Sequence, residues 1–251
     1  MMRTAVRAGA LAALSLQILS FTTPALAGPS EYVYTPIVQE GEREIDFKAG
    51  TAKNKDGTRE SAQSIGLGYG VNSWWFTEVY GKWHKEPGER HTFDAWEWEN
   101  KFQLTETGKY PVEVGFLLEI ERPKDRSEGY EYKWGPLLQT DITPRIQANL
   151  NVLVEKHIRT ATPSKAELGY QWQLKYRLQP AFEYGLQGIG GLGPVSNWSP
   201  KNEQTHKVGP AVFGRIRAGQ KEFIKFNAAV LFGTTNATPN TTLRLQTEYE
   251  F

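Results

Sequence analysis

Charged side chains recur at every second position in several segments of the chain. Glu97, Glu99 and Lys101 follow one another in this way. Residues two apart lie on the same face of a β-strand, so such a segment would carry a column of charge on one face. Columns of charge that line a pore determine which ions pass. The residues that we expect in this charge ladder are Glu78, Lys82, Glu97, Glu99, Lys101, Glu113, Glu119, Lys133 and Arg244.

Register arithmetic predicts which of these charges face one another across neighbouring strands. We expect one hairpin to pair Lys82 with Glu97, Tyr80 with Glu99 and Glu78 with Lys101. The next turn would place Lys101 opposite Glu113, and the following loop would place Glu119 opposite Lys133. Such pairs would hold charged side chains in place and narrow the lumen, or act as a selectivity filter, and these two roles are compatible.

Four histidines could bind a metal ion, because imidazole is the commonest metal ligand in proteins. They are His84, His91, His157 and His206, and all are expected near one end of the fold. Their spacing matches no known metal motif, so we expect no metal or other cofactor, and the sequence leaves open whether they bind an ion. No G-x-S-x-G or H-E-x-x-H motif is present, so we expect no catalytic residues and no enzyme.

The elements that would position these residues are β-strands. Apolar and polar residues alternate with period two over many stretches of about ten residues, which predicts strands that are apolar on one face. Short and long connections alternate along the chain, as expected for an up-and-down meander. Pro136 and Pro210 fall inside two segments, so the strand bounds there stay open. The twelve segments are 43–53, 62–72, 75–85, 93–104, 110–121, 130–141, 145–157, 166–178, 181–189, 206–217, 222–233 and 241–251.

The number of strands indicates which face lies inside. A closed barrel of about twelve strands encloses too much space to be filled with apolar side chains. The polar face would therefore line a wet lumen, and the apolar face would meet lipid. We predict an all-β fold, a closed antiparallel up-and-down transmembrane β-barrel of about twelve strands over 43–251. A soluble sandwich is the alternative.

The N-terminal 27 residues have the pattern of a secretory signal peptide. They contain Arg3 and Arg7, an apolar run from Leu11 to Leu19, and the small-x-small sequence Ala25-Leu26-Ala27. The formal net charge of the whole chain is only +1, which gives no argument for nucleic-acid binding. The chain has no cysteine, which excludes disulfides and thiolate metal sites.

Residues 28–42 fit no strand, and we predict an N-terminal periplasmic extension or partial plug. Gly66, Gly68 and Gly70 would form a stripe without side chains on the lumen face of one strand. A glycine stripe often marks the close approach of another backbone. We therefore expect Tyr32 or Tyr34 to pack against it, the alternative being that the glycines only permit strand curvature.

With its signal peptide, its even number of amphipathic strands and its terminal Tyr249-Glu250-Phe251, the chain resembles Gram-negative outer-membrane β-barrel proteins. The resemblance implies that Tyr249 and Phe251 are the assembly signal, with outer-membrane lipid and the barrel-assembly machinery as partners. It also implies location in the cell outer membrane. Small barrels of this class include channels and lipid-modifying enzymes. We expect a narrow channel or porin for ions or small polar solutes; the alternatives are a plugged structural or surface-binding barrel without transport and, third, a lipid hydrolase.

Overall fold

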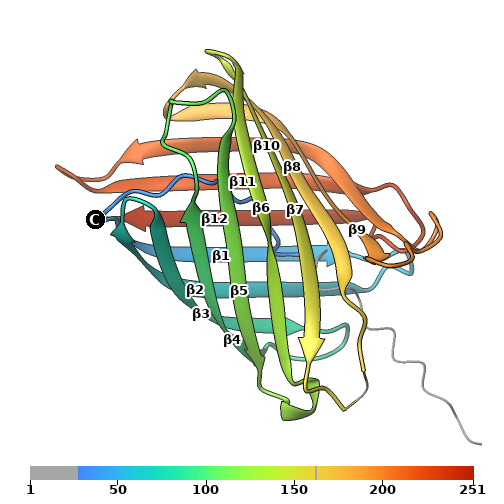
Figure 1. The fold of residues 1–251 in the computed structure, drawn as a ribbon. Helices are drawn as coiled ribbons and strands as arrows, with labels where there is room; N and C mark the ends of the chain where they lie inside the picture. The colour runs from blue at the N-terminus through green and yellow to red at the C-terminus, as the bar shows by residue number, and fades with distance from the viewer. Residues whose placement is uncertain (1–27, 162) are drawn as a thin grey trace, which may run out of the picture.

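The computed structural model describes residues 28–161 and 163–251, so the predicted signal peptide lies outside the described residues. Twelve antiparallel strands form a closed barrel in which each strand pairs with its neighbours in sequence and β1 pairs with β12 (Figure 1). The predicted fold class is confirmed. The strands are β1 (Arg43–Lys53), β2 (Arg59–Asn72), β3 (Trp75–Lys85), β4 (Thr92–Gln103), β5 (Glu113–Pro123), β6 (Tyr130–Thr143), β7 (Ile146–Ile158), β8 (Glu167–Gln179), β9 (Phe182–Pro194), β10 (Thr205–Arg217), β11 (Phe223–Gly233) and β12 (Thr241–Glu250).

The two faces of the barrel wall differ sharply in polarity. Charged residues such as Asp46 and Lys48 point inward and are buried. Their apolar neighbours point outward, and Leu67 and Val79 are exposed over half or more of their surface. A soluble barrel has the opposite arrangement, with apolar residues inside. The polar face therefore lies inside, as the strand count predicts.

The connections alternate between the two ends of the barrel, which we call the turn end and the loop end. The turn end carries residues 73–74, 104–112, 144–145, 180–181 and 218–222, together with the C-terminus. The loop end carries 54–58, 86–91, 124–129, 159–166, 195–204 and 234–240, and η2 (Arg126–Glu128) lies in one of these loops. The connection 104–112 is longer than the predicted 105–109.

Within the described part of the chain, no helix has the length and apolar character needed to cross a membrane.

The two prolines inside strands are accommodated without a change of register. Pro136 pairs with Phe116 on β5. Between β6 and β7 no residues pair from 135 to 136, and pairing resumes at Leu137 in the same register. Pro210 likewise pairs with Leu186 on β9, and the β10–β11 pairing skips the same kind of stretch. Because proline lacks a backbone N–H, each one leaves a gap in a single ladder while the other ladder continues.

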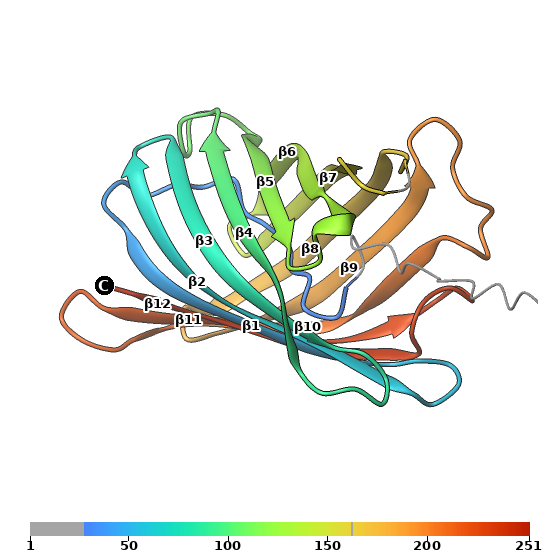
Figure 2. The ribbon, with the colours of Figure 1, turned by 90° about the horizontal axis from the view of Figure 1, so that it is seen from below.

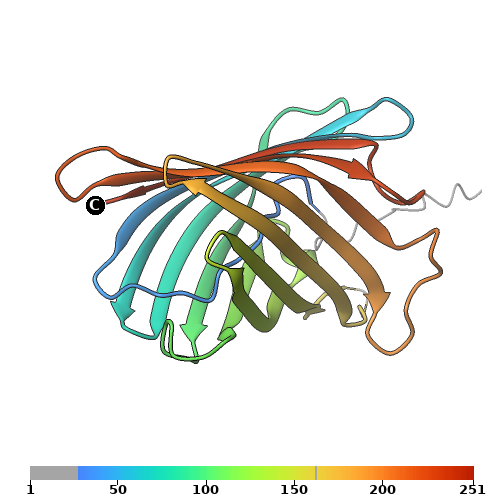
Figure 3. The ribbon, with the colours of Figure 1, turned by 90° about the horizontal axis from the view of Figure 1, so that it is seen from above.

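The barrel is flattened rather than round. Seen from below and from above, β10–β12 and β1 form a flatter wall, and β3–β8 curve opposite it (Figures 2 and 3). Residues 28–42, which precede β1, run inside the ring of strands rather than outside it. The predicted extension is therefore a segment of the barrel interior.

Candidate functional site: the lumen network around residues 28–42

We call residues 28–42 the inner segment. Side chains from four different strands bond to its backbone, so it is held from several sides of the barrel. Val38 N donates to Gln103 Oε1 at 2.7 Å, Asn151 donates to Tyr34 O at 3.2 Å, Arg244 donates to Glu31 O at 3.1 Å, and Lys207 donates to Gly28 O at 2.7 Å. Gly28 therefore lies inside the ring of strands, and of the two alternatives stated for residues 28–42, a periplasmic extension or a partial plug, this position fits the second.

Three wall glycines let the inner segment approach the barrel closely. A Cβ at Gly50 would lie 1.9 Å from Pro29 O, and one at Gly70 would lie 2.0 Å from Gln39 O. A Cβ at Gly115 would lie 2.8 Å from Pro36 Cβ. Any side chain at these positions would collide with the inner segment, so the absence of a Cβ determines how close it lies to β1, β2 and β5.

Tyr34 fills an apolar patch on the inner wall. Its ring packs with the fully buried Leu117, Leu137 and Leu153 from β5, β6 and β7. Its hydroxyl donates to Glu119, and its ring centroid lies 4.4 Å from that of Tyr32. The wall thus offers Tyr34 an apolar surface for the ring and an acceptor for the hydroxyl, which suits an amphipathic side chain.

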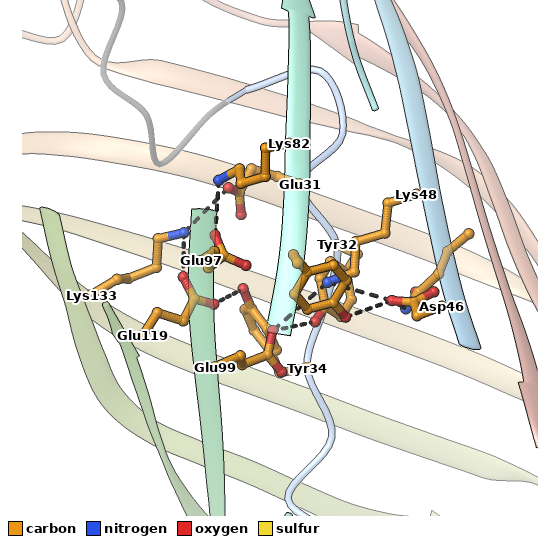
Figure 4. A network of polar contacts seen from close by, with 12 residues as sticks. Glu31, Tyr32, Tyr34, Asp46, Lys48, Lys82, Glu97, Glu99, Glu119 and Lys133 are labelled. Atoms are coloured by element: carbon orange, nitrogen blue, oxygen red, sulfur yellow. Dashed lines mark hydrogen bonds and ion pairs between the residues drawn. The ribbon is translucent and has the colours of Figure 1, made fainter. Parts of the chain in front are cut away.

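Tyr32 lies in the adjoining part of the network, where a lysine sits between two tyrosine rings (Figure 4). The Lys48 ammonium lies 3.8 Å from the ring centroids of both Tyr32 and Tyr80. Tyr32 donates to Glu99 at 2.9 Å, and Tyr80 donates to Asp46 at 2.7 Å. Cation–π contact with two rings and two nearby carboxylates stabilise this buried charge. Lys48 Nζ lies 3.5 Å from Asp46 and 3.7 Å from Glu99.

The remaining charges of the network alternate in sign. Lys133 bridges Glu119 on β5, at 2.9 Å, and Glu31 of the inner segment, at 3.3 Å (Figure 4). Lys82 bridges Glu97, at 2.8 Å, and Glu121. Buried ions are costly unless they are paired. The network thus joins the inner segment to the wall through paired charges.

The predicted charge ladder is brought together only in part. The side chains of Lys82 and Glu97 meet, as do those of Glu119 and Lys133. The other ladder residues lie on the inner wall with other partners: Glu78 is opposite Glu99, Lys101 lies 4.9 Å from the ring centroid of Phe76, Glu113 accepts from Gln139 at 3.1 Å, and Arg244 donates to Glu31 O, Gln187 and Asn227.

Two of the three predicted registers are wrong. Tyr80, not Lys82, is opposite Glu97, and Lys101 is opposite Leu117 rather than Glu113. The first hairpin contains an irregularity between Lys82 and Trp83, and the turn after β4 is longer than predicted. The predicted register is wrong by two residues between β3 and β4 and by four residues between β4 and β5. Because side chains alternate between the two faces of a strand, a shift by an even number of residues leaves each side chain on its predicted face. The predicted pairing of Glu119 with Lys133 is confirmed.

The predicted packing on the glycine stripe also needs correction. Tyr80 lies closest to Gly66, and Phe76 lies closest to Gly68, both from the neighbouring strand β3. These rings fill the space above the stripe, so Tyr32 and Tyr34 direct their hydroxyls to carboxylates on β4 and β5 instead. Only at Gly70 does the backbone of the inner segment lie against the stripe, with Gly41 N donating to Gly70 O at 2.8 Å.

The sequence analysis did not identify the apolar patch that receives Tyr34. Leu117, Leu137 and Leu153 occupy inward positions, where the alternation places polar residues. An apolar residue at an inward position in three consecutive strands is the signal that could have revealed it. A second inward apolar cluster lies on β9–β11 and consists of Ile189, Ala211, Phe213, Ala229 and Leu231.

The histidines and the terminal aromatic residues lie at opposite ends of the barrel. At the loop end His84 lies 3.1 Å from Asp94, His91 lies 3.4 Å from Ser61, His157 lies 3.5 Å from Glu131 and from Glu155, and His206 lies 2.8 Å from Tyr170. At the turn end Tyr249 and Phe251 are exposed on the outer surface, and their rings stack with centroids 5.7 Å apart.

Comparison with known proteins supports the fold. No protein-family model matches the sequence, and no curated protein does so either. The NanC porin structure is similar over 82% of this chain and 98% of that chain, with 10% sequence identity and a TM-score of 0.55. The chain has the outer-membrane porin fold. The architectural resemblance predicted from the sequence is thereby confirmed.

Two further similar structures share less of the fold. CdiB from Acinetobacter baumannii has 8% identity and a TM-score of 0.44, over 85% of this chain and 60% of that chain. OprD of Pseudomonas aeruginosa has 12% identity and a TM-score of 0.38, over 82% of this chain and 66% of that chain.

Proposed function

We propose that the protein is an outer-membrane channel for ions or small polar solutes, with a lumen that the inner segment narrows. The observation that carries this proposal is the polarity of the closed barrel, which is charged inside and apolar outside. A closed barrel satisfies all strand hydrogen bonds and so suits a bilayer. The similar NanC structure is that of a porin, which supports the same function here.

The dimensions and surface of the barrel fit this location. Strands of ten or more residues that rise ~3.3 Å per residue and tilt by ~40° span about 25 Å, the height of the apolar band of outer-membrane barrels. Aromatic residues are exposed near both ends of the strands, as in the interfacial girdles of such barrels. Trp96 is exposed toward the loop end, and Trp74, Tyr110, Phe182 and Phe251 are exposed toward the turn end.

The residues of the lining support the proposed class of solute. Carboxylates and ammonium groups alternate around the inner segment, so the route beside it would suit small hydrated ions and polar molecules. An apolar solute would gain nothing from this surface.

The proposed location has two further parts. Tyr249 and Phe251 would carry the assembly signal, and residues 1–27 would be removed on secretion.

A plugged barrel with a structural or surface-binding role is the second candidate. It is favoured by the burial of the inner segment, in which Val33, Tyr34 and Val38 are each less than a tenth exposed. If the inner segment never moves, the lumen would transmit little. The two candidates therefore differ in conductance and share the same fold.

Planar-bilayer recording tests the proposal. The full-length protein should give small steady currents, and a variant lacking residues 29–40 should give larger ones. The double substitution Y32A/Y34A should also raise the current, because both hydroxyl contacts and the ring packing are lost. Tyr69 and Tyr184 are exposed on the outer surface, so Y69A/Y184A is the matched control and should conduct like the unaltered protein.

The folding of every variant is checked by heat-modifiable gel mobility before recording. If the folded full-length protein and both inner-segment variants are silent, the second candidate replaces the channel. If all conduct equally, the barrel is a channel that the inner segment does not narrow.

A further inference from the structure

Two carboxylates and an imidazole converge at the loop end of the lumen. Glu131 on β6 lies opposite His157 on β7 in the strand register, and Glu155 precedes His157 by two residues on the same face. His157 Nε2 lies 3.5 Å from Glu131 Oε2 and 3.5 Å from Glu155 Oε1. One ligand atom from each of the three residues can be chosen so that all lie within 4.8 Å of one another.

The carboxylate of Glu155 is left without a full set of partners. Glu155 is 3% exposed, and its Oε2 atom is buried without a hydrogen-bond partner among the described residues. Burying an unpaired carboxylate oxygen costs free energy. An unpartnered, buried oxygen beside a second carboxylate and an imidazole is the arrangement expected where a cation binds.

The lysine nearest in the strand register does not neutralise these two carboxylates. Lys133 is the register partner of Glu155, but its ammonium lies with Glu119 and Glu31 at 2.9 and 3.3 Å. Among the described residues, the basic group within ion-pair distance of Glu131 and Glu155 is His157. The cluster therefore holds two buried carboxylates and one basic group that is charged only when protonated.

Two other carboxylate triads in the barrel differ in this respect. One consists of Glu97, Glu99 and Glu119, which pair with Lys82, Lys48 and Lys133, respectively. The other consists of Glu42, Glu44 and Glu250, and Lys225 pairs with Glu42 and Glu250. In each of these two triads, lysine ammonium groups already pair with carboxylates. Within the described residues, the triad of Glu131, Glu155 and His157 is the one that includes an imidazole, a ligand that suits ions of the Zn²⁺ class.

We propose that Glu131, Glu155 and His157 bind a divalent transition-metal ion of the Zn²⁺ class. Two ligands at 2.0–2.1 Å from a tetrahedral zinc lie about 3.4 Å apart, close to the two imidazole–carboxylate separations of 3.5 Å. A mixed set of carboxylate and imidazole ligands suits such ions, with water completing the coordination. The His157 side chain is 31% exposed, which gives an ion access from the loop end.

Calorimetric titration with Zn²⁺ tests the proposal on untagged full-length protein that has been folded in detergent and treated with chelator. We expect one site, with affinity at least about tenfold weaker in E155Q and in H157Q. The matched control is H206Q, because His206 is also at the loop end but bonds to Tyr170 and Gln204. It should bind Zn²⁺ like the unaltered protein, and Mg²⁺ at the same concentration should not compete.

Folding is verified for each variant by heat-modifiable mobility. Should E155Q fail to fold, H157Q still decides the matter, since its side chain is partly exposed. The proposal fails if the folded protein binds no Zn²⁺, or if H157Q retains full affinity. It also fails if H206Q loses as much affinity as H157Q, which would place the ion elsewhere.

Discussion

The hydroxyl groups of Tyr32 and Tyr34 are among the contacts that hold the inner segment to the wall. The Tyr34 hydroxyl donates to Glu119, a buried carboxylate that also forms an ion pair with Lys133. Removing the hydroxyl leaves a buried acceptor without one of its donors, at a cost of about 1–3 kcal/mol. We predict that Y34F lowers the free energy of unfolding by this amount in urea titrations. Tyr184 is exposed on the outer surface, so Y184F should leave it unchanged.

A larger loss is expected at Lys48. Its ammonium lies between two tyrosine rings and near Asp46 and Glu99, and the residue is 5% exposed. K48M leaves these carboxylates with less compensating charge, and breaking a buried pair typically costs 3–5 kcal/mol. Urea unfolding should show a loss of about this size. Lys109 forms an exposed pair with Glu106, and K109M should unfold like the unaltered protein.

Glu42, the last residue of the inner segment, makes the stability of the folded protein dependent on pH. Burial, and hydrogen bonding to Glu250, raise the pKa of Glu42 to about 6. Because this exceeds its ordinary value of 4.5, the folded protein binds the proton more tightly than the unfolded chain does. Its contribution to stability is therefore greatest below pH 4.5 and is lost as pH rises through about 6.

The measurement is the difference in unfolding free energy between pH 5 and pH 7.5, for the unaltered protein and for E42Q. The contribution of Glu42 should be about 1–2 kcal/mol more favourable at pH 5, and E42Q should lack it. An identical pH dependence in both proteins would refute the assignment to Glu42.

At the scale of elements, backbone contact between the inner segment and β1 depends on Gly50. A Cβ there would lie 1.9 Å from Pro29 O, so G50A should push the start of the inner segment away from the wall. We predict faster chymotrypsin cleavage after Tyr32 and Tyr34 in folded G50A. At Gly81 a Cβ would meet the Trp83 and Trp96 side chains, away from the inner segment, so G81A should leave the cleavage rate unchanged.

Strand positions could be read from the sequence because each strand is polar on one face and apolar on the other. Most predicted bounds agree with the structure within three residues, as for 43–53 and 75–85. The segment predicted at 181–189 extends to Pro194, since Gly190, Gly191 and Gly193 hide the alternation there. Registers were less accessible, because they depend on turn lengths and on one irregularity within a strand.

The site could be predicted only in outline. The spacing of the charged residues predicted that their side chains line the lumen, and a partial plug was one of two alternatives for residues 28–42. The structure places both the charged side chains and residues 28–42 inside the barrel. The partners of Tyr32 and Tyr34 were not predictable, because they depend on which rings of β3 already fill the space above Gly66 and Gly68. Contacts between residues far apart in sequence follow from register and packing together.

At the scale of the whole molecule, the barrel should remain closed without its inner segment. All twelve strand pairings lie outside residues 28–42, and β1 closes on β12 through ten paired positions. A variant lacking 29–40 should therefore keep heat-modifiable mobility. Its melting temperature should fall, since the contacts of Tyr34 with Leu117, Leu137 and Leu153 are lost. Loss of the folded band would show that the barrel needs the inner segment to close.

The position of the inner segment also constrains the order of events during folding. The ring of strands closes when β1 pairs with β12. Because this pairing joins the first and last strands of the barrel, it closes a long loop and has a large entropic cost. Before that pairing, residues 28–42 can enter sideways through the open seam. Afterwards they can enter or leave only lengthwise, past the contacts at Gly50, Gly70 and Gly115. A chain that closes too early would thus be trapped with its inner segment outside, separated from the native form by a slow threading step.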